Sequence, residues 1–221
     1  NGNEYVEGIL GCAKARAVSF NVNYRYVAEE LRYLLDNAGA RGIIFHATFA
    51  PVVADLLETM PPDERARIGV LMQVADDSGE ALVDGAVDYE EALAASDPAG
   101  PGLIPSPDDL YIVYTGGTTG MPKGVMWPHR NLLATAAATF AVVKRPVPTT
   151  PAEVAAAVRD FHEQGRAVRL LPAAPLMHGT SAITAVAVLS AGGTVTTLTR
   201  RSFDADELCR AVERDRITQL T

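Results

Sequence analysis

The pattern of apolar and polar residues along the chain predicts alternating helices and strands. Apolar residues recur with helical spacing over Glu4 to Ala15 and over Tyr26 to Asn37. Short apolar runs of strand length lie at Ala17 to Val22, Ile43 to Phe45 and Ile68 to Gln73. Alternation of this kind is typical of an α/β fold, so we expect a layered sandwich with a largely parallel sheet.

The second half of the chain continues the pattern on both sides of a stretch that has no apolar periodicity. Asp109 to Tyr114 (DLYIVY) is an apolar run of strand length, and His129 to Val143 has the alanine and leucine content of a helix. A further helix is predicted over Pro151 to Gln164, and a strand over Val168 to Leu171. The proline- and glycine-rich segment Ala95 to Pro107 is interpreted as a surface connector within one domain.

The stretch without periodicity, Tyr114 to Val125, has the composition of a phosphate-binding loop. It reads YTGGTTGMPKGV and is here called the phosphate motif. Its glycines can take positive φ and bring the backbone close to phosphate oxygens, its threonine hydroxyls can donate hydrogen bonds, and its lysine adds a positive charge. We expect a strand to lead into this loop and a helix to follow it. The residues predicted to bind nucleotide phosphate are Thr115, Gly116, Gly117, Thr118, Thr119, Gly120, Pro122 and Lys123.

Two other phosphate motifs do not fit these residues. The Walker loop requires Gly-Lys-Ser/Thr, whereas Lys123 has proline before it and glycine after it, and the glycine spacing does not match the dinucleotide fingerprint Gly-x-Gly-x-x-Gly. A plain Gly/Thr-rich surface turn with an incidental lysine is the alternative interpretation. Lysine is scarce in this chain, occurring only at Lys14, Lys123 and Lys144, and this scarcity weighs against an incidental lysine.

The phosphate motif resembles the nucleotide-phosphate loop of the adenylate-forming superfamily, whose usual form is Tyr/Phe-Thr-Ser-Gly-Thr-Thr-Gly-x-Pro-Lys-Gly. Acyl-CoA synthetases, the adenylation domains of peptide synthetases and firefly-type luciferases belong to that superfamily. Gly116 is the one departure in the run, and it removes a serine hydroxyl. The following Met126 and Trp127 make the stretch similar to actinobacterial fatty-acyl-CoA synthetases, some of which take bulky or steroid-side-chain acids. The segment Glu4 to Phe45 also resembles the superfamily upstream of its loop.

A second resemblance lies at Pro175 to Ser181, which reads PLMHGTS. In the superfamily the histidine of this motif borders the acyl pocket and the path of the attacking thiol, which implies that role for His178. The alternative is a histidine in a loop before a helix start that Gly179, Thr180 and Ser181 cap. Methionine replaces the usual aromatic residue before the histidine and suggests a pliable wall. In peptide-synthetase adenylation domains an aspartate in this region pairs with the amine of the substrate. No aspartate occurs here from Leu170 to Thr199, so the resemblance disfavours an amino acid substrate.

The resemblance implies part of an ATP-dependent fatty-acid–CoA ligase, in which a carboxylate and ATP give acyl-AMP and pyrophosphate, and the acyl group then passes to coenzyme A. It implies Lys123 and His178 as catalytic residues, Thr119 as a residue at Mg²⁺, and ATP, Mg²⁺ and coenzyme A as cofactors. Superfamily members are more than twice as long, and both ends of this sequence look cut. We therefore interpret residues 1–221 as a single partial N-terminal domain that lacks the C-terminal small domain and is inactive without the remainder of its enzyme.

Three alternatives stay open at this point. An adenylation domain would load its acid onto a carrier protein instead of coenzyme A. A luciferase-like oxidase would use the same adenylation half-reaction. A non-catalytic nucleotide-binding module would keep the fold and the ATP site without turnover.

The amino-acid composition limits the possible binding partners of the protein and its cellular compartment. Nineteen basic and 27 acidic residues give a net charge of −8, which argues against nucleic acid as a partner. No apolar run approaches the ~20 residues of a membrane span, and the first residues do not form a signal peptide. Cys12 and Cys209 lack metal-ligand spacing and are interpreted as buried thiols of a cytoplasmic protein.

Four further side chains are expected to have structural roles and no chemical ones. Asn21 and Asn23 are expected to stabilise a turn after the first strand. His162, on a charged helix, is expected to be solvated, and Trp127 is expected to pack in the interior.

Overall fold

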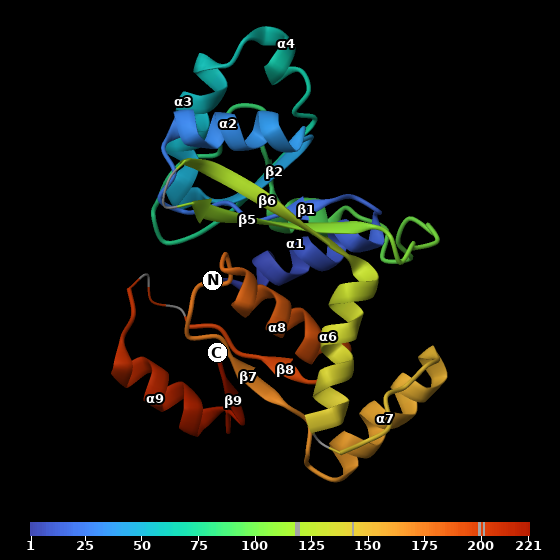
Figure 1. Cartoon of the computed structure of the whole chain (residues 1–221). Coiled ribbons are helices and arrows are strands. Elements are labelled where there is room, and N and C mark those ends of the chain that lie inside the picture. The colour runs from blue at the N-terminus through green and yellow to red at the C-terminus, as the bar shows by residue number, and fades with distance from the viewer. Residues whose placement is uncertain (118–119, 143, 199, 201) are drawn as a thin grey trace. The chain divides into compact units, whose positions relative to one another are not determined.

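Figure 1 shows the computed structural model of the chain, which describes all residues except 118–119, 143, 199 and 201. The chain forms two compact units. Unit 1 comprises Asn1–Asn21, Leu103–Val113 and Val125–Thr221, and unit 2 comprises Val22–Gly102 and Tyr114–Gly124. Parallel strand pairs and intervening helices occur in both units, so the predicted α/β class is confirmed. That residues 1–221 form one partial domain stays a prediction.

Unit 2 is built on a small parallel sheet whose strands, in spatial order, are β2 (Gly42–His46), β3 (Val70–Val74) and β4 (Val87–Asp88). Gly42 pairs with Val70, and Met72 pairs with Val87. The helices of this unit are α2 (Ala28–Ala38), the 3-10 turn η1 (Ala47–Phe49), α3 (Ala50–Thr59), α4 (Pro62–Arg65) and α5 (Tyr89–Ala94). The side chains of Leu34 in α2 and Leu56 in α3 are completely buried, so the contact between these helices forms the core of unit 2.

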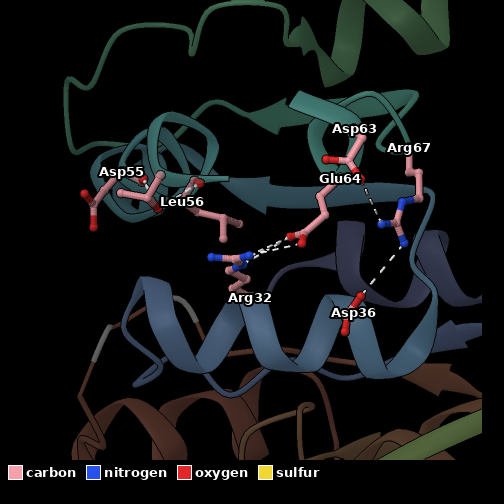
Figure 2. A network of polar contacts seen from close by, with 8 residues as sticks. Arg32, Asp36, Asp55, Leu56, Asp63, Glu64 and Arg67 are labelled. Atoms are coloured by element: carbon pink, nitrogen blue, oxygen red, sulfur yellow. Dashed lines mark hydrogen bonds and ion pairs between the residues drawn. The ribbon is translucent and has the colours of Figure 1, made fainter. Parts of the chain in front are cut away.

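A group of charged side chains connects α2 with the segment of α4 (Figure 2). Arg32 donates two hydrogen bonds of 3.1 Å to the Glu64 carboxylate. The Arg67 guanidinium lies 3.9 Å from a carboxylate oxygen of Asp36 and 3.9 Å from one of Asp63. Partly exposed pairs of this kind contribute about 0–1 kcal/mol each, so they orient the two helices more than they stabilise them.

Two further sheets include strands of unit 1. In the first, β5 (Leu110–Gly117) lies between β1 (Ser19–Phe20) and β6 (Gly120–Pro128), and Ser19 pairs in parallel with Tyr111. Residues 114–117 of β5 and 120–124 of β6 belong to unit 2. In the second, β7 (Arg169–Leu171) lies between β8 (Thr194–Val195) and β9 (Gln219–Leu220), with both pairings parallel. The helices of unit 1 are α1 (Asn3–Lys14), α6 (His129–Val142), α7 (Pro151–Glu163), α8 (Gly179–Ser190) and α9 (Ala205–Arg214).

The interior of unit 1 gathers around α8, which Figure 1 shows beside α6. One cluster of buried residues consists of Val6, Leu170, Leu176, Ala185 and Val188. A second consists of Tyr111, Val113, Leu132 and Ala182, and Trp127 packs against it, which confirms the packing role expected for that tryptophan. Helix α7 is attached through Phe161, whose ring stacks on Phe140 of α6 with centroids 5.5 Å apart.

Several expected elements are confirmed with small shifts of their ends, whereas the expectations for the helix after the phosphate motif and for Cys209 are wrong. Strand β6 separates the phosphate motif from α6, so the helix does not follow the loop directly. Cys209 is exposed, although Cys12 is half-buried and its burial raises the pKa of that thiol. His162 is exposed as expected, and its Nε2 also lies 2.8 Å from the Gly192 carbonyl oxygen. Among the described helices, none is long and apolar enough to cross a membrane.

The ion pair between Arg16 and Asp109 predicts a loss of stability in acid. Two nitrogens of Arg16 donate to the Asp109 carboxylate, at 3.0 and 2.8 Å, and the Ser106 backbone N–H donates to it at 2.9 Å. These hydrogen bonds, that from Arg16 first, lower the pKa of Asp109 from 3.8 to about 2. The carboxylate therefore stabilises the folded state above pH 3.8, and this contribution is lost as the pH falls through about 2.

We accordingly expect Asp109→Asn to lower the free energy of unfolding at neutral pH and to match the wild type at the acid end of this window. Denaturant titrations across the pH range measure the difference. Asp108→Asn is the control, because the Asp108 side chain is 70% exposed in its pair with Arg130 and should change little. A difference between wild type and Asp109→Asn that does not depend on pH would contradict the prediction.

Candidate functional site

The phosphate motif lies on the ribbon formed by β5 and β6. Thr115 and Gly116 belong to β5, and Pro122 and Lys123 belong to β6. Gly117 ends β5 and Gly120 begins β6, whereas Thr118 and Thr119 lie outside the described residues. The motif is therefore more extended than the loop that the sequence predicted.

The conformation of Gly116 differs from the one expected for it. Its φ is not positive, and a Cβ placed there would meet no atom within 4 Å. Gly116 thus lies in ordinary extended backbone, with room for the serine that the family pattern has at this position. The glycine is not required by local backbone geometry, and its effect is the loss of one hydroxyl donor.

Thr115 and Lys123 are brought together on neighbouring strands. The Thr115 hydroxyl lies 3.5 Å from the Lys123 carbonyl oxygen, at the long limit of a hydrogen bond. Both side chains are exposed, and within the described part of the chain the Lys123 ammonium has no acidic partner. An exposed hydroxyl and an exposed ammonium from neighbouring strands are suited to an anion such as a phosphate group.

The start of the motif is anchored within unit 2. The Tyr114 hydroxyl donates a 2.7 Å hydrogen bond to the Asn37 side chain near the end of α2. Tyr114 is buried, and this burial raises the pKa of its phenol. The anchor holds the strand at the residue immediately before Thr115, so it limits the freedom of the phosphate motif.

The described residues offer no cluster of three or more His, Cys, Asp or Glu side chains that could hold a metal ion. Thr119, which the family resemblance associates with Mg²⁺, lies outside those residues. Mg²⁺ commonly binds through one or two protein ligands together with substrate phosphates, so the fit of a metal here depends on a bound nucleotide.

The second motif forms the turn that leads into α8 in unit 1. Leu176 is completely buried, whereas His178 is the exposed N-cap residue of the helix. The His178 backbone N–H donates to the Pro175 carbonyl at 2.9 Å, and its own carbonyl accepts from the Ala182 N–H at 3.1 Å. In the described part of the chain the His178 imidazole makes no hydrogen bond or ion pair. The backbone of this turn therefore determines the position of the Cα from which the side chain extends.

The alternative interpretation of this motif was that Gly179, Thr180 and Ser181 cap the helix. These three residues do not cap it. His178 itself occupies the N-cap position without a side-chain cap bond, and Ser181 is completely buried. Gly179 packs closely against β5, because a Cβ at Gly179 would lie 2.9 Å from Cγ1 of Val113. A glycine at this position is thus explained by close packing.

The expected turn is found at Asn23, whose side-chain oxygen accepts from the Arg25 backbone N–H at 3.0 Å. Asn21 behaves differently. Its side-chain amide donates a 2.9 Å hydrogen bond to the carbonyl of Met177, the residue before His178. This link could not be predicted from sequence, because 156 residues separate the two partners.

The structure thus groups Thr115, Gly116 and Lys123 on the ribbon in unit 2, and it places His178 at the N-cap of α8 in unit 1. Comparison with known proteins adds the family. The model of the AMP-binding enzyme family matches residues 1–221. The chain belongs to the AMP-binding enzyme family. The phosphate motif therefore lies in a chain of this family, and its binding of phosphate stays a prediction.

Relatives of this AMP-binding enzyme chain carry names of CoA ligases. It is 41% identical over 222 residues to the medium-chain acyl-CoA ligase Mig of Mycobacterium avium, covering 100% of this chain and 39% of that protein. It is 40% identical over 133 residues to a 3-oxocholest-4-en-26-oate–CoA ligase of Rhodococcus rhodochrous, covering 60% of this chain and 23% of that protein. The chain therefore spans well under half the length of these curated relatives.

Solved structures of the same fold match almost the whole chain. The inhibitor-bound N-terminal domain of FACL13 from Mycobacterium tuberculosis superposes with a TM-score of 0.67 at 26% identity, covering 98% of this chain and 46% of that one. An acyl-CoA synthetase from Brucella canis gives a TM-score of 0.72 at 21% identity, covering 99% of this chain and 35% of that one, and shows the fold alone. The predicted N-terminal adenylate-forming fold is confirmed.

Proposed function

We propose that the chain is part of an AMP-forming acid–thiol ligase that activates a fatty or steroid-side-chain carboxylic acid with ATP and transfers it to coenzyme A. The observation that carries the proposal is the pairing of exposed Thr115 and Lys123 on the ribbon of β5 and β6, inside a chain of the AMP-binding enzyme family. The names of Mig and of the Rhodococcus ligase support the medium-chain and steroid-side-chain acids as the substrate class.

In the first half-reaction the substrate carboxylate attacks the α-phosphorus of ATP, and pyrophosphate leaves. A carboxylate is ionised at neutral pH, so the attack requires no strong base. The leaving pyrophosphate gains negative charge, and we assign Lys123 and the Thr115 hydroxyl to its stabilisation. Gly116, Gly117, Thr118, Thr119, Gly120 and Pro122 complete the proposed phosphate site.

Mg²⁺ would supply further positive charge at these phosphate oxygens, with Thr119 as the proposed residue beside it. The contribution of the described residues does not depend on the metal. Lys123 presents one cationic group, and Thr115 presents one hydroxyl donor on the neighbouring strand.

In the second half-reaction the thiol of coenzyme A attacks the acyl carbonyl, and AMP leaves. We assign His178 to the border of the acyl site. It is the N-cap residue of α8, and its ring makes no hydrogen bond to any described residue. Met177 lies beside it and is half-buried, so this part of the proposed wall is a flexible thioether side chain.

Carboxylate-dependent exchange of pyrophosphate into ATP by the complete protein tests the proposal. Medium-chain, long-chain and steroid-side-chain acids are compared, and coenzyme A is compared with a carrier protein as the acceptor. Exchange with one acid class, followed by thioester formation on coenzyme A, is the expected result. ATP binding without exchange for any acid would favour a non-catalytic nucleotide-binding module, and transfer to the carrier alone would favour a carrier-loading adenylation domain.

The same assay on residues 1–221 alone tests the finer part of the proposal, that this chain does not turn over by itself. The proposal is supported by the share of its relatives that the chain covers, which is 39% for Mig.

A further inference from the structure

Asn21 is one of three polar side chains in the described interior, where it is 7% exposed. It directly follows β1, whose parallel pairing with β5 fixes where it lies. A buried amide contributes to stability only when it is hydrogen-bonded, and burying it without a partner destabilises the folded state. The partner of the Asn21 amide at 2.9 Å is the Met177 carbonyl, in the turn that carries His178.

This hydrogen bond acts on one particular peptide group. The carbonyl of Met177 and the N–H of His178 belong to the same planar unit. The carbonyl accepts from Asn21 at 2.9 Å, and the N–H donates to the Pro175 carbonyl at 2.9 Å. Rotation of this plane would break both bonds, so the peptide is held at both ends.

This peptide group is bonded directly to the Cα of His178, which carries the imidazole side chain. The imidazole has no partner of its own among the described residues, so its direction depends on the backbone at the N-cap. We propose that Asn21 is a positioning residue, whose amide fixes the Met177–His178 peptide and thereby aims His178 at the acyl substrate. The inference rests on the proposed function, because it takes the role of His178 from there.

The role requires a hydrogen-bond donor of the length of asparagine. Aspartate has the same shape but would place a carboxylate oxygen against the Met177 carbonyl, where two acceptors repel each other. Leucine has a similar volume and no donor. Serine is too short to span the distance and gives a milder variant should the other two fold poorly.

The test measures steady-state kinetics of thioester formation by the complete protein carrying Asn21→Leu, Asn21→Asp or Asn21→Ser. We expect Asn21→Leu and Asn21→Asp to lower kcat/KM for the acid by about tenfold, the effect of losing one hydrogen bond, with KM for ATP unchanged. Asn21→Ser should lower kcat/KM for the acid by a smaller factor. The effect should disappear in a His178→Ala background, because a positioning residue acts through the residue that it positions.

Gln73→Leu is the matched control for a merely structural loss. Gln73 is 4% exposed in unit 2, and its side-chain amide bonds the Ala81 carbonyl and the Val83 N–H, each at 3.0 Å. We expect this variant to lose stability without a selective loss of kcat/KM for the acid.

Three results would overturn the inference. Asn21 variants with wild-type kinetics, or losses that simply add to that of His178→Ala, would remove the positioning role while leaving the proposed function standing. Absence of carboxylate-dependent pyrophosphate exchange by the wild type would remove the proposed function, and the inference with it.

Discussion

Lys123→Ala is expected to slow formation of acyl-AMP by about 10²–10³-fold, the usual effect of removing one preorganised group that stabilises developing charge. Lys123 is exposed and has no acidic partner in the described part of the chain, so its ammonium is available to phosphate oxygens. Thioester formation from supplied acyl-AMP should change far less, because pyrophosphate has already left. Single-turnover assays of the two half-reactions measure the difference.

Two further variants show which property of Lys123 matters. Lys14→Ala removes the same charge from an exposed position in the last turn of α1, and it should leave both half-reactions unchanged. Lys123→Arg keeps the charge but changes its shape and its hydrogen-bonding pattern, so partial activity is expected. Equal slowing of both half-reactions by Lys123→Ala would contradict the role assigned to this residue.

Gly193→Ala is expected to lower the free energy of unfolding by about 3 kcal/mol, the upper part of the range for overpacking a closed interior. A Cβ at this position would lie 2.5 Å from Cγ1 of Val188 and 2.6 Å from the Val168 carbonyl oxygen. That carbonyl accepts the Thr194 N–H at 2.9 Å, next to the pairing of Arg169 with Thr194. The backbone cannot move away without loosening the pair of β7 and β8.

Denaturant titration of the single variant measures this loss. Gly11→Ala is the matched control, since it makes the same change on α1, where a Cβ would meet no atom within 4 Å. Alanine favours a helix over glycine by about 1 kcal/mol, so this control should gain stability. Unfolding midpoints that are the same for Gly193→Ala and the wild type would show that the strand pair tolerates the added methyl group.

Elements with a strong local signal were predictable from the sequence. Helix α7 is one, because Thr150 and Glu153 form a capping box and proline occupies the first turn. Strands β4 and β8 span two residues each, which is too short for any periodicity to show. Strand β6 was missed because its glycines and prolines disfavour strands locally, and its pairing with β5 decides its conformation.

In the candidate site, too, some features could be predicted from the sequence and others could not. Composition pointed to Lys123 and to the threonines of the phosphate motif, because hydroxyl and ammonium groups in a glycine-rich run are a local pattern. The link from Asn21 to Met177 was not predictable, since it depends on the parallel pairing of β1 with β5 and on the turn before α8. A buried polar residue next to a short strand was the one available signal, and it was interpreted as a turn.

The interleaving of the two units has a consequence for the order in which the chain folds during synthesis. The segments of unit 2 are complete once Gly124 has left the ribosome. The first residues of unit 1 form their native contacts only after later segments are synthesised. Strand β1 pairs with the later strand β5, and the Asn21 amide can bond the Met177 carbonyl only after Met177 is made. Strand β7 gains its partner β9 last of all. Strand β1 and the Asn21 amide therefore stay without these partners until the later segments are made, and Val6 of α1 is buried only once Leu170, Leu176 and Ala185 are present. Apolar surface that is exposed during synthesis in this way is prone to aggregation.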